Sequence, residues 1–246
     1  MQIGEVLWNP WHGCKKISEG CKNCYVYRID QRVGRNPEDV QKTENFLLPL
    51  KRTRNGEFKI PPRTKVYACL SSDFFLEAAD LWRKEIWQAI KIRKDLEFSI
   101  ITKRIHRFEE CVPDDWGEGY ENVRIISTCE NQRQADFRIP ILLNAPIAKR
   151  EIICEPLLEN IDFRESLKSG KILNVTVGGE SGENARICRH EWVENIRKQC
   201  LDAKVSFYFK QTGFKYEKDG RIFTIARNKQ LIQAAKSGLS FQFKND

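Results

Sequence analysis

Short runs of β-branched and aromatic residues alternate along the chain with segments whose apolar positions follow helical spacing. The runs predict strands over residues 5–8, 65–70, 97–102, 123–128, 150–154, 172–177 and 205–210. The segments between them predict helices over residues 77–94, 104–111, 132–143, 157–168 and 191–203. A strand followed by a helix, repeated about six times, is typical of a parallel sheet with crossover helices. We therefore expect an α/β fold, a complete or partial (β/α) barrel with parallel strands.

The length of 246 residues is enough for one large domain, since α/β barrels of this size commonly fold as a single unit. We expect such a domain over residues 1–246. Polar residues dominate the stretch 31–63, which ends close to two consecutive prolines and is a candidate insertion or loop. Residues 214–246 form a C-terminal extension, in which the pattern predicts a last helix and a strand.

The composition is that of a soluble globular protein, with 41% hydrophobic and 31% charged residues. No apolar run approaches the ~18 residues needed to cross a bilayer. The start of the chain lacks the basic and apolar regions of a signal peptide, so we expect a cytoplasmic protein. The net charge of +8 favours an anionic partner such as nucleic acid, although the lysines and arginines are spread over the whole chain.

Polar segments follow every predicted strand, and several of them place a charge directly at the strand end. Parallel strands in a barrel gather their carboxyl ends on one face, where such folds build their sites. The charged residues at these ends are Lys103, Glu130, Glu155, Glu180 and Lys210. Helix capping explains the Ser, Asp, Asn and Thr residues nearby but not these charges. We expect a polar, mixed-charge basin, with a buried ring of ion pairs as the alternative.

Chemistry suggests a role for each kind of strand-end residue. Lysine and arginine at Lys103, Arg104 and Lys210 are suited to bind a carboxylate or a phosphate. The candidates for hydrogen bonds to a ribose or for proton exchange are Glu130, Asn131 and Glu155, and Ser127 joins the cofactor-binding candidates. Cys129 and Cys154 each precede a glutamate and could supply a hydrogen atom, but a small buried side chain is the simpler interpretation.

Three of the nine cysteines form the motif C-x6-C-x2-C, with Cys14, Cys21 and Cys24. A structural zinc site needs four protein ligands, so His12, Cys129 or Cys188 would have to complete it. Three cysteines also suit a [4Fe-4S] cluster whose fourth iron is left to a small molecule. The spacing alone leaves the cluster, zinc and unligated thiols open. Most of the remaining cysteines lie in apolar patterns and are expected to be buried and inert.

The residues around the three cysteines favour the cluster. Gly13 and Gly20 permit tight backbone turns around the sulfurs. Nearby lysines, at positions 15, 16 and 22, would offset the negative charge of a thiolate-ligated cluster. Tyr25 directly follows the last cysteine and is expected to begin a helix that backs the loop.

Eight motifs in a fixed order carry a family resemblance. They read W-N-P-x-x-G-C, G-C-K-N-C-Y, L-S-S-D-F, T-K-R, C-E-N-Q-x-x-A-D-x-R-I-P, C-E-P-L-L, G-G-E-S-G-x-x-A-R and F-K-Q-T-G, and they extend from Trp8 to Gly213. In this order they resemble the phage-associated three-Cys-motif proteins, a family of phage proteins of unknown function. That family is in turn similar to the radical S-adenosylmethionine (SAM) enzymes.

The resemblance implies a partial (β/α) barrel of the radical SAM type, with the cysteine loop after its first strand. It implies that Cys14, Cys21 and Cys24 ligate a [4Fe-4S] cluster whose fourth iron binds SAM, and that reductive cleavage of SAM yields a 5′-deoxyadenosyl radical. The segment Gly178-Gly179-Glu180 resembles the one that holds the SAM amine. The sequence departs from the usual pattern in a first cysteine gap three residues longer, in Asn23 where an aromatic residue is common, and in a Gly-Gly-Glu segment that follows a late strand.

The resulting hypothesis is an enzyme that cleaves SAM to modify or repair a nucleic-acid or nucleotide substrate, reduced by a protein such as flavodoxin or ferredoxin. Its expected catalytic residues are Cys14, Cys21, Cys24, Lys103 and Glu155. Basic charge and an aromatic-rich entrance formed by Trp8, Trp11, Tyr25 and Tyr27 favour that substrate, while a peptide stays open. The alternative is a non-catalytic nucleic-acid-binding protein with a structural zinc or a closed iron-sulfur site.

Overall fold

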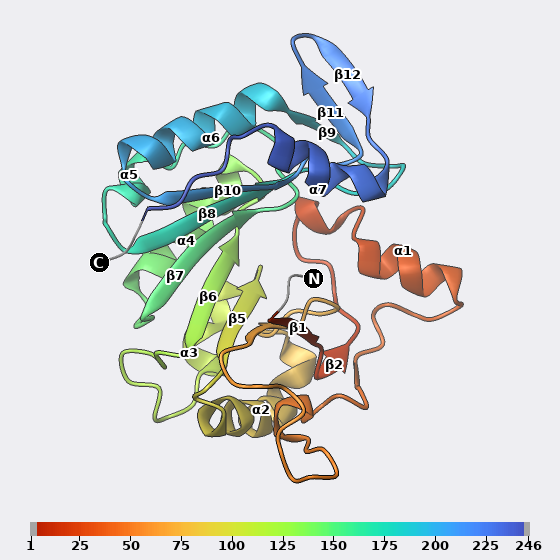
Figure 1. Ribbon diagram of the computed structural model, residues 1–246, viewed down its shortest axis with the longest axis vertical. Helices are drawn as coiled ribbons and strands as arrows, with labels where there is room; N and C mark the ends of the chain where they lie inside the picture. The colour runs from red at the N-terminus through yellow and green to blue at the C-terminus, as the bar shows by residue number, and fades with distance from the viewer. Residues whose placement is uncertain (1–3, 244–246) are drawn as a thin grey trace. The chain divides into compact units, whose positions relative to one another are not determined.

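The computed structural model describes residues 4–243 (Figure 1). The chain divides into two compact units. The first unit contains residues up to 16, 26–126 and 145–149, and the second contains residues 17–25, 127–144 and those from 150 onward. The single domain and the insertion expected from the sequence stay predictions.

Seven strands form the main sheet, and all seven were predicted. Their bounds are β1 (Glu5–Trp8), β4 (Lys65–Ala68), β5 (Glu97–Thr102), β6 (Val123–Thr128), β7 (Lys149–Cys154), β8 (Ile172–Gly178) and β10 (Ser206–Gln211), in the order β1-β4-β5-β6-β7-β8-β10. The pairings β1–β4 and β4–β5 in the first unit are parallel, as are β7–β8 and β8–β10 in the second. The predicted α/β fold, a partial (β/α) barrel with parallel strands, is confirmed.

Helices of the first unit follow its strands as the sequence predicts. They are α1 (Tyr25–Arg32), α2 (Asp80–Ile92) and α3 (Phe108–Cys111), with the 3-10 turns η2 (Leu48–Leu50), η3 (Glu77–Ala79) and η4 (Ile105–Arg107). α2 buries Ile86, Trp87 and Ile90, which share one helix face. Strand β4 stops two residues before its predicted end because Cys69 adopts a positive φ of 60°. A short pair, β2 (Trp11–His12) and β3 (Gln41–Lys42), completes this unit.

The core of the first unit is aromatic, and it includes three side chains expected at an entrance. Trp8 and Trp11 are completely buried, and Tyr27 is only 9% exposed. The indole N–H of Trp8 donates to the carbonyl oxygen of Asn45 at 2.9 Å, and that of Trp11 donates to Asp73 at 3.3 Å. The expected aromatic entrance is therefore wrong for these three residues, because internal carbonyl groups satisfy the two indole N–H groups. Tyr25, at 42% exposure, is the one of the four that faces solvent.

Among the described residues, the second unit contains four helices and a separate three-stranded sheet. The helices are α4 (Gln132–Asn144), α5 (Arg164–Leu167), α6 (His190–Asp202) and α7 (Arg227–Lys236), with the 3-10 turn η1 (Glu19–Cys21). The smaller sheet has the order β12-β11-β9, formed by β9 (Ile187–Arg189), β11 (Lys215–Lys218) and β12 (Arg221–Thr224). The C-terminal extension thus adds a hairpin and a helix where one helix and one strand were expected. Across residues 4–243, no helix has the length and apolar character needed to span a bilayer.

The predicted helix over residues 157–168 is wrong in its first half, because α5 begins only at Arg164. The backbone N–H groups of Leu157 and Leu158 donate to the carbonyl oxygens of Gly178 and Glu130. The side-chain amide of Gln199 donates to the carbonyl oxygen of Ile161 at 2.9 Å. It also accepts a hydrogen bond from the backbone N–H of Phe163 at 2.5 Å. Because partners distant in sequence satisfy these backbone groups, the segment before Arg164 can remain irregular without leaving buried polar groups unpaired.

Candidate functional site

Exposure separates the motif cysteines from the others, and all nine lie within the described residues. Cys14, Cys21 and Cys24 are partly exposed, whereas the other six are buried. Burial raises the pKa of Cys188 and Cys200 to about 12, so these thiols stay protonated at neutral pH. A buried, protonated thiol is a poor metal ligand and a poor nucleophile. The expectation that most cysteines outside the motif are buried is confirmed.

We expect three of the nine thiols to react readily in the folded, metal-free chain. Mass mapping after brief exposure to iodoacetamide at neutral pH should find adducts at Cys14, Cys21 and Cys24, because these three residues are partly exposed. Denatured protein provides the control, in which all nine thiols are modified. Early modification of a buried cysteine such as Cys188 would contradict the assignment.

Cys14 is fixed in the first unit by its backbone. Its N–H donates to the carbonyl oxygen of Pro37 at 2.8 Å, and its carbonyl oxygen accepts from the Tyr27 hydroxyl at 2.6 Å. The preceding Gly13 has φ of 95°, and a Cβ there would lie 2.5 Å from the carbonyl oxygen of Asp39. Only glycine suits that position.

Arg104, which follows β5, contacts the Cys14 segment. Its Nη2 donates to the carbonyl oxygen of Lys15 at 2.8 Å, and its Nη1 lies 3.9 Å from the Sγ of Cys14. The same guanidinium is 3.5 Å from the carboxylate of Asp73, which follows β4. Arg104 was predicted to bind an anion, and the structure places its positive charge beside a motif sulfur.

Lys103 stands beside Arg104 and is half-buried. Its backbone N–H donates to Asp73 at 2.9 Å, and Asp73 also accepts from the hydroxyl of Thr102 at 2.7 Å. Within the part of the chain that the structure describes, no acidic side chain pairs with the Lys103 ammonium. The predicted role of Lys103 in binding an anionic ligand stays a prediction.

Glu130 fastens the loop of Cys21 in the second unit. Its carboxylate is completely buried and accepts from the Ser18 hydroxyl and from the Gly20 backbone N–H at 3.1 Å. The buried Arg138 guanidinium balances the charge at 2.7 Å. A Cβ on Gly20 would lie 3.0 Å from the Glu130 carboxyl group, so a larger residue would displace it. Glu130 thereby positions the turn that ends at Cys21.

Glu180 fastens the same loop near Cys24. It accepts from the Asn23 amide at 2.9 Å and from the Arg186 guanidinium at 2.7 and 3.1 Å. Burial raises the pKa of Glu180, hydrogen bonds from Arg186 and Asn23 lower it, and the net pKa is below the usual value. Arg186 also donates to the carbonyl oxygen of Glu19 at 3.2 Å. An ionised Glu180 therefore ties its own turn to the cysteine loop.

The predicted cofactor-binding roles of Glu130, Asn131, Glu180 and Ser127 stay predictions. The carboxylates of Glu130 and Glu180 are engaged by donors of the chain itself, and the Asn131 amide donates to Glu19 at 3.4 Å. The hydroxyl of Ser127, at the end of β6, is buried and has no hydrogen-bond partner among the described residues. A buried orphan hydroxyl is an open position for a ligand or an ordered water.

The Gly-Gly-Glu turn packs against the chain's own F-K-Q-T-G segment. A Cβ on Gly179 would fall deep inside the contact radius of the Thr212 carbonyl oxygen, and Gly213, opposite, has φ of 79°. The two glycines at 178 and 179 were predicted to let backbone approach a ligand. The close approach in the structure is to Thr212, which is sufficient to require glycine at position 179.

Gly179→Ala should lower the free energy of unfolding by about 3 kcal/mol, because the added Cβ meets backbone that cannot step aside. Gly178→Ala is the matched control. The atoms nearest to its Cβ would belong to the Glu155 and Gln211 side chains, at 3.0 and 3.2 Å, so the loss should be smaller. Urea denaturation measures the free energy of unfolding of both variants. Equal losses would contradict the prediction, because they would show that the backbone around residue 179 moves to accommodate the added Cβ.

Glu155, Lys210 and Gln211 meet beside this turn. The Lys210 ammonium lies 2.6 Å from one carboxylate oxygen of Glu155, and the Gln211 amide donates to the other at 2.5 Å. The side chain of Glu155 is 17% exposed and that of Lys210 is 40% exposed. Glu130, by comparison, is inaccessible. Among the predicted acidic candidates at strand ends, Glu155 is therefore one that a substrate could reach.

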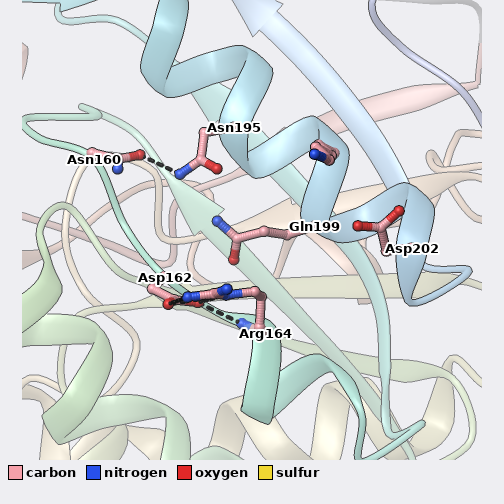
Figure 2. A pocket seen from close by; sticks show the side chains of 7 residues that line it. Asn160, Asp162, Arg164, Asn195, Gln199 and Asp202 are labelled. Atoms are coloured by element: carbon pink, nitrogen blue, oxygen red, sulfur yellow. Dashed lines mark hydrogen bonds and ion pairs between the residues drawn. The ribbon is translucent and has the colours of Figure 1, made fainter.

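A polar pocket of about 380 Å³ lies elsewhere in the second unit (Figure 2). Its lining residues are Asn160, Asp162, Arg164, Asn195, Lys198, Gln199 and Asp202. Dashed lines in Figure 2 join Asn160 to Asn195 and Asp162 to Arg164. None of the predicted site residues lines this pocket. Its one buried polar side chain, Gln199, is occupied with backbone groups, so we assign the pocket no function.

Two residues that position the cysteine loop were not singled out from the sequence. Arg186 ends the motif G-G-E-S-G-x-x-A-R, six residues after Glu180, so its signal was present in the motif. Asn23 was noted only as a departure from an aromatic residue. The structure explains it, because an aromatic side chain could not donate the amide hydrogen bonds to Glu180 and to the carbonyl oxygen of Asn184.

The fold and these residues define an α/β protein with a parallel partial barrel and three partly exposed cysteines in the segment before α1. Within residues 4–243, no three or more His, Cys, Asp or Glu side chains are gathered so as to hold a metal ion. The chain matches, over residues 2–240, the family described as protein of unknown function (DUF5131), and it belongs to that family. No curated protein and no solved structure matches it.

Proposed function

We propose that the protein is a radical-SAM-like iron-sulfur enzyme in which Cys14, Cys21 and Cys24 ligate a [4Fe-4S] cluster. The observation that carries the proposal is that these three, of nine cysteines, are partly exposed while the other six are buried. The resemblance of eight ordered motifs to the phage-associated three-Cys-motif proteins supports it. The ligand assignment rests on sequence spacing and exposure and not on a preformed ligand geometry.

The donor set fits such a cluster. Thiolates are its usual ligands, and three of them leave one iron for the amine and carboxylate of SAM. The Arg104 guanidinium, whose Nη1 lies 3.9 Å from the Cys14 sulfur, would offset the negative charge of a thiolate-ligated cluster. The buried hydroxyl of Ser127 has no hydrogen-bond partner within residues 4–243, so it is a polar group that a ligand could use. When bound, the cluster would supply the electron for the reductive cleavage of SAM, with flavodoxin or ferredoxin as the proposed reductant.

In this proposal, some residues of the chain position the cysteine loop and others contact the substrate. Glu130 and Glu180 position the loop of Cys21 and Cys24 through the contacts described above. Glu155, partly exposed and paired with Lys210, is the proposed group that exchanges a proton with substrate. Lys103 is the proposed partner of a substrate phosphate, since its ammonium has no acidic partner among the described residues. The proposed substrate is a nucleic acid or a nucleotide.

Metal analysis of protein purified and reconstituted without oxygen tests the proposal. We expect about four iron and four sulfide per chain. Incubation with SAM and a low-potential reductant should then release 5′-deoxyadenosine, measured by chromatography. Colourless protein with one zinc per chain would overturn the proposal. An intact cluster that neither binds nor cleaves SAM would reassign the protein as an electron carrier or sensor.

One contact favours a second candidate, a non-catalytic nucleic-acid-binding protein with structural zinc. The Nε2 of His12 lies 2.8 Å from the buried carboxylate of Asp30, an arrangement common for histidines that bind metal through the other ring nitrogen. His12→Ala separates the two candidates. It should abolish zinc binding in a Cys-and-His site, whereas a cluster held by three cysteines should keep its iron.

A further inference from the structure

A β-hairpin of the second unit is exposed along its outer strand. β11 and β12 pair antiparallel around a two-residue turn, in which Asp219 and Gly220 have φ of 53° and 73°. Every residue from 218 to 224 is exposed. Figure 1 shows the hairpin extending beyond α6 and α7. Its outer strand carries Ile222 and Phe223, at 58% and 47% exposure, where a natural edge strand is usually protected.

The pairing register places an aromatic ring and two cations on one face. Phe223 lies opposite Tyr216, and Arg221 lies opposite Lys218. Since residues two apart on a strand share a face, all four belong to the same face of the hairpin. Tyr216 is only 7% exposed, whereas the other three lie in the exposed part of the hairpin. Ile222 belongs to the opposite face, so the ring of Phe223 and the two cations form a distinct surface.

Charge on and beside the hairpin is strongly positive. Residues 215–236 contain six lysines and arginines and two acidic residues, a net charge of +4 out of the +8 of the whole chain. One of the acidic residues, Glu217, is already engaged by Arg189 at 3.5 Å and by the Gly220 backbone N–H at 3.0 Å. Within residues 4–243, no acidic side chain pairs with Lys215, Lys218 or Arg221. Unpaired cations in such density attract a polyanion.

We propose that the β11–β12 hairpin binds single-stranded nucleic acid, with Lys218 and Arg221 on phosphates and Phe223 stacked on a base. The positive charge favours a nucleic acid over an apolar protein partner. The exposed ring favours a single strand, because unpaired bases offer their faces for stacking. This inference rests on the nucleic-acid part of the proposed function and makes no use of the cluster.

Fluorescence anisotropy with a labelled oligothymidine of about 20 nucleotides tests the charge contribution. Full-length protein prepared in air, without cluster or SAM, is titrated over a salt series. Lys218→Glu combined with Arg221→Glu should weaken binding at least about tenfold at low salt and reduce the slope of log K against log salt by about 1.4, or about 0.7 for each lost phosphate contact. The control is Lys84→Glu with Lys94→Glu, which reverses two exposed charges in the first unit and should leave the slope unchanged.

A second pair of variants tests stacking. Phe223→Ala should weaken oligothymidine binding about 5- to 100-fold, whereas Ile222→Ala, on the opposite face of the same strand, should stay within about twofold of the parent. Absence of binding by the parent protein would overturn the inference. The inference would also be overturned if Lys218→Glu with Arg221→Glu bound oligothymidine as tightly as the Lys84→Glu, Lys94→Glu control. A protein that preferred duplex DNA, and whose binding was unchanged by Phe223→Ala, would overturn it as well. If the protein binds oligothymidine but does not cleave SAM, only the proposed cofactor chemistry is overturned. If it cleaves SAM but does not bind oligothymidine, only the proposed role of the hairpin is overturned.

Discussion

Replacing Glu130 with alanine is expected to lower the free energy of unfolding by about 3–5 kcal/mol. The Glu130 carboxylate is completely buried, and the Arg138 side chain that pairs with it is 2% exposed. Removing the carboxylate leaves a guanidinium charge inside the protein without its counter-ion. The Ser18 hydroxyl and the Gly20 N–H lose their acceptor at the same time. Urea denaturation followed by circular dichroism measures the loss.

Two controls separate the buried charge from a general effect of deleting an acid. Glu165→Ala removes the carboxylate of a surface ion pair with Lys168, and it should change stability by no more than about 0.5 kcal/mol. Replacing Glu130 with leucine and Arg138 with methionine together should recover a large part of the loss, because neither buried charge remains. A Glu130→Ala variant as stable as the parent would show that the pair is not buried in solution.

Loosening of the cysteine loop should accompany this loss of stability. Cys21 and Cys24 lie in the segment that Glu130 and Glu180 fasten, so their alkylation should accelerate in Glu130→Ala under conditions where the chain is still folded. Cys14, which belongs to the first unit, provides an internal reference. Acceleration at all three cysteines alike would indicate global unfolding and not a local effect.

The main sheet could be predicted because each strand is a compact apolar run bounded by polar residues. Residues 157–163 show where this reasoning fails. Leu157 and Ile161 have helical spacing and are buried, as a helix would require. Their segment is nevertheless irregular, because its backbone bonds to Gly178, Glu130 and Gln199. Apolar spacing reports which side chains are buried, and it cannot report hydrogen bonds to partners that are distant in sequence.

The candidate site was predictable in its residues but not in its pairings. Glu130 and Glu180 were selected because each follows a strand end. A carboxylate at a strand end looks the same in sequence whether it awaits a ligand or accepts from the chain itself. The donors to Glu130 and Glu180, at Ser18 and Asn23, lie 112 and 157 residues away along the chain. No local pattern connects such pairs.

Alanine at any one of Cys14, Cys21 and Cys24 is expected to remove nearly all cluster iron and to reduce 5′-deoxyadenosine formation by more than about 100-fold. Loss of a residue that only supports a metal ligand commonly costs about 10- to 100-fold, so loss of the ligand itself should cost more. The measurement is iron per chain and SAM cleavage after identical anaerobic reconstitution.

The matched control for these variants is Cys111→Ala, which removes a buried thiol from the first unit. Burial raises the pKa of Cys111 to about 11, so its sulfur stays protonated near neutral pH and should not ligate iron. This variant should keep its iron even if it loses some stability. A motif variant with full iron content would contradict three-cysteine ligation. If all three motif variants instead lost one equivalent of zinc and the parent contained no iron, the same three sulfurs would belong to a structural site, and the catalytic proposal would fail.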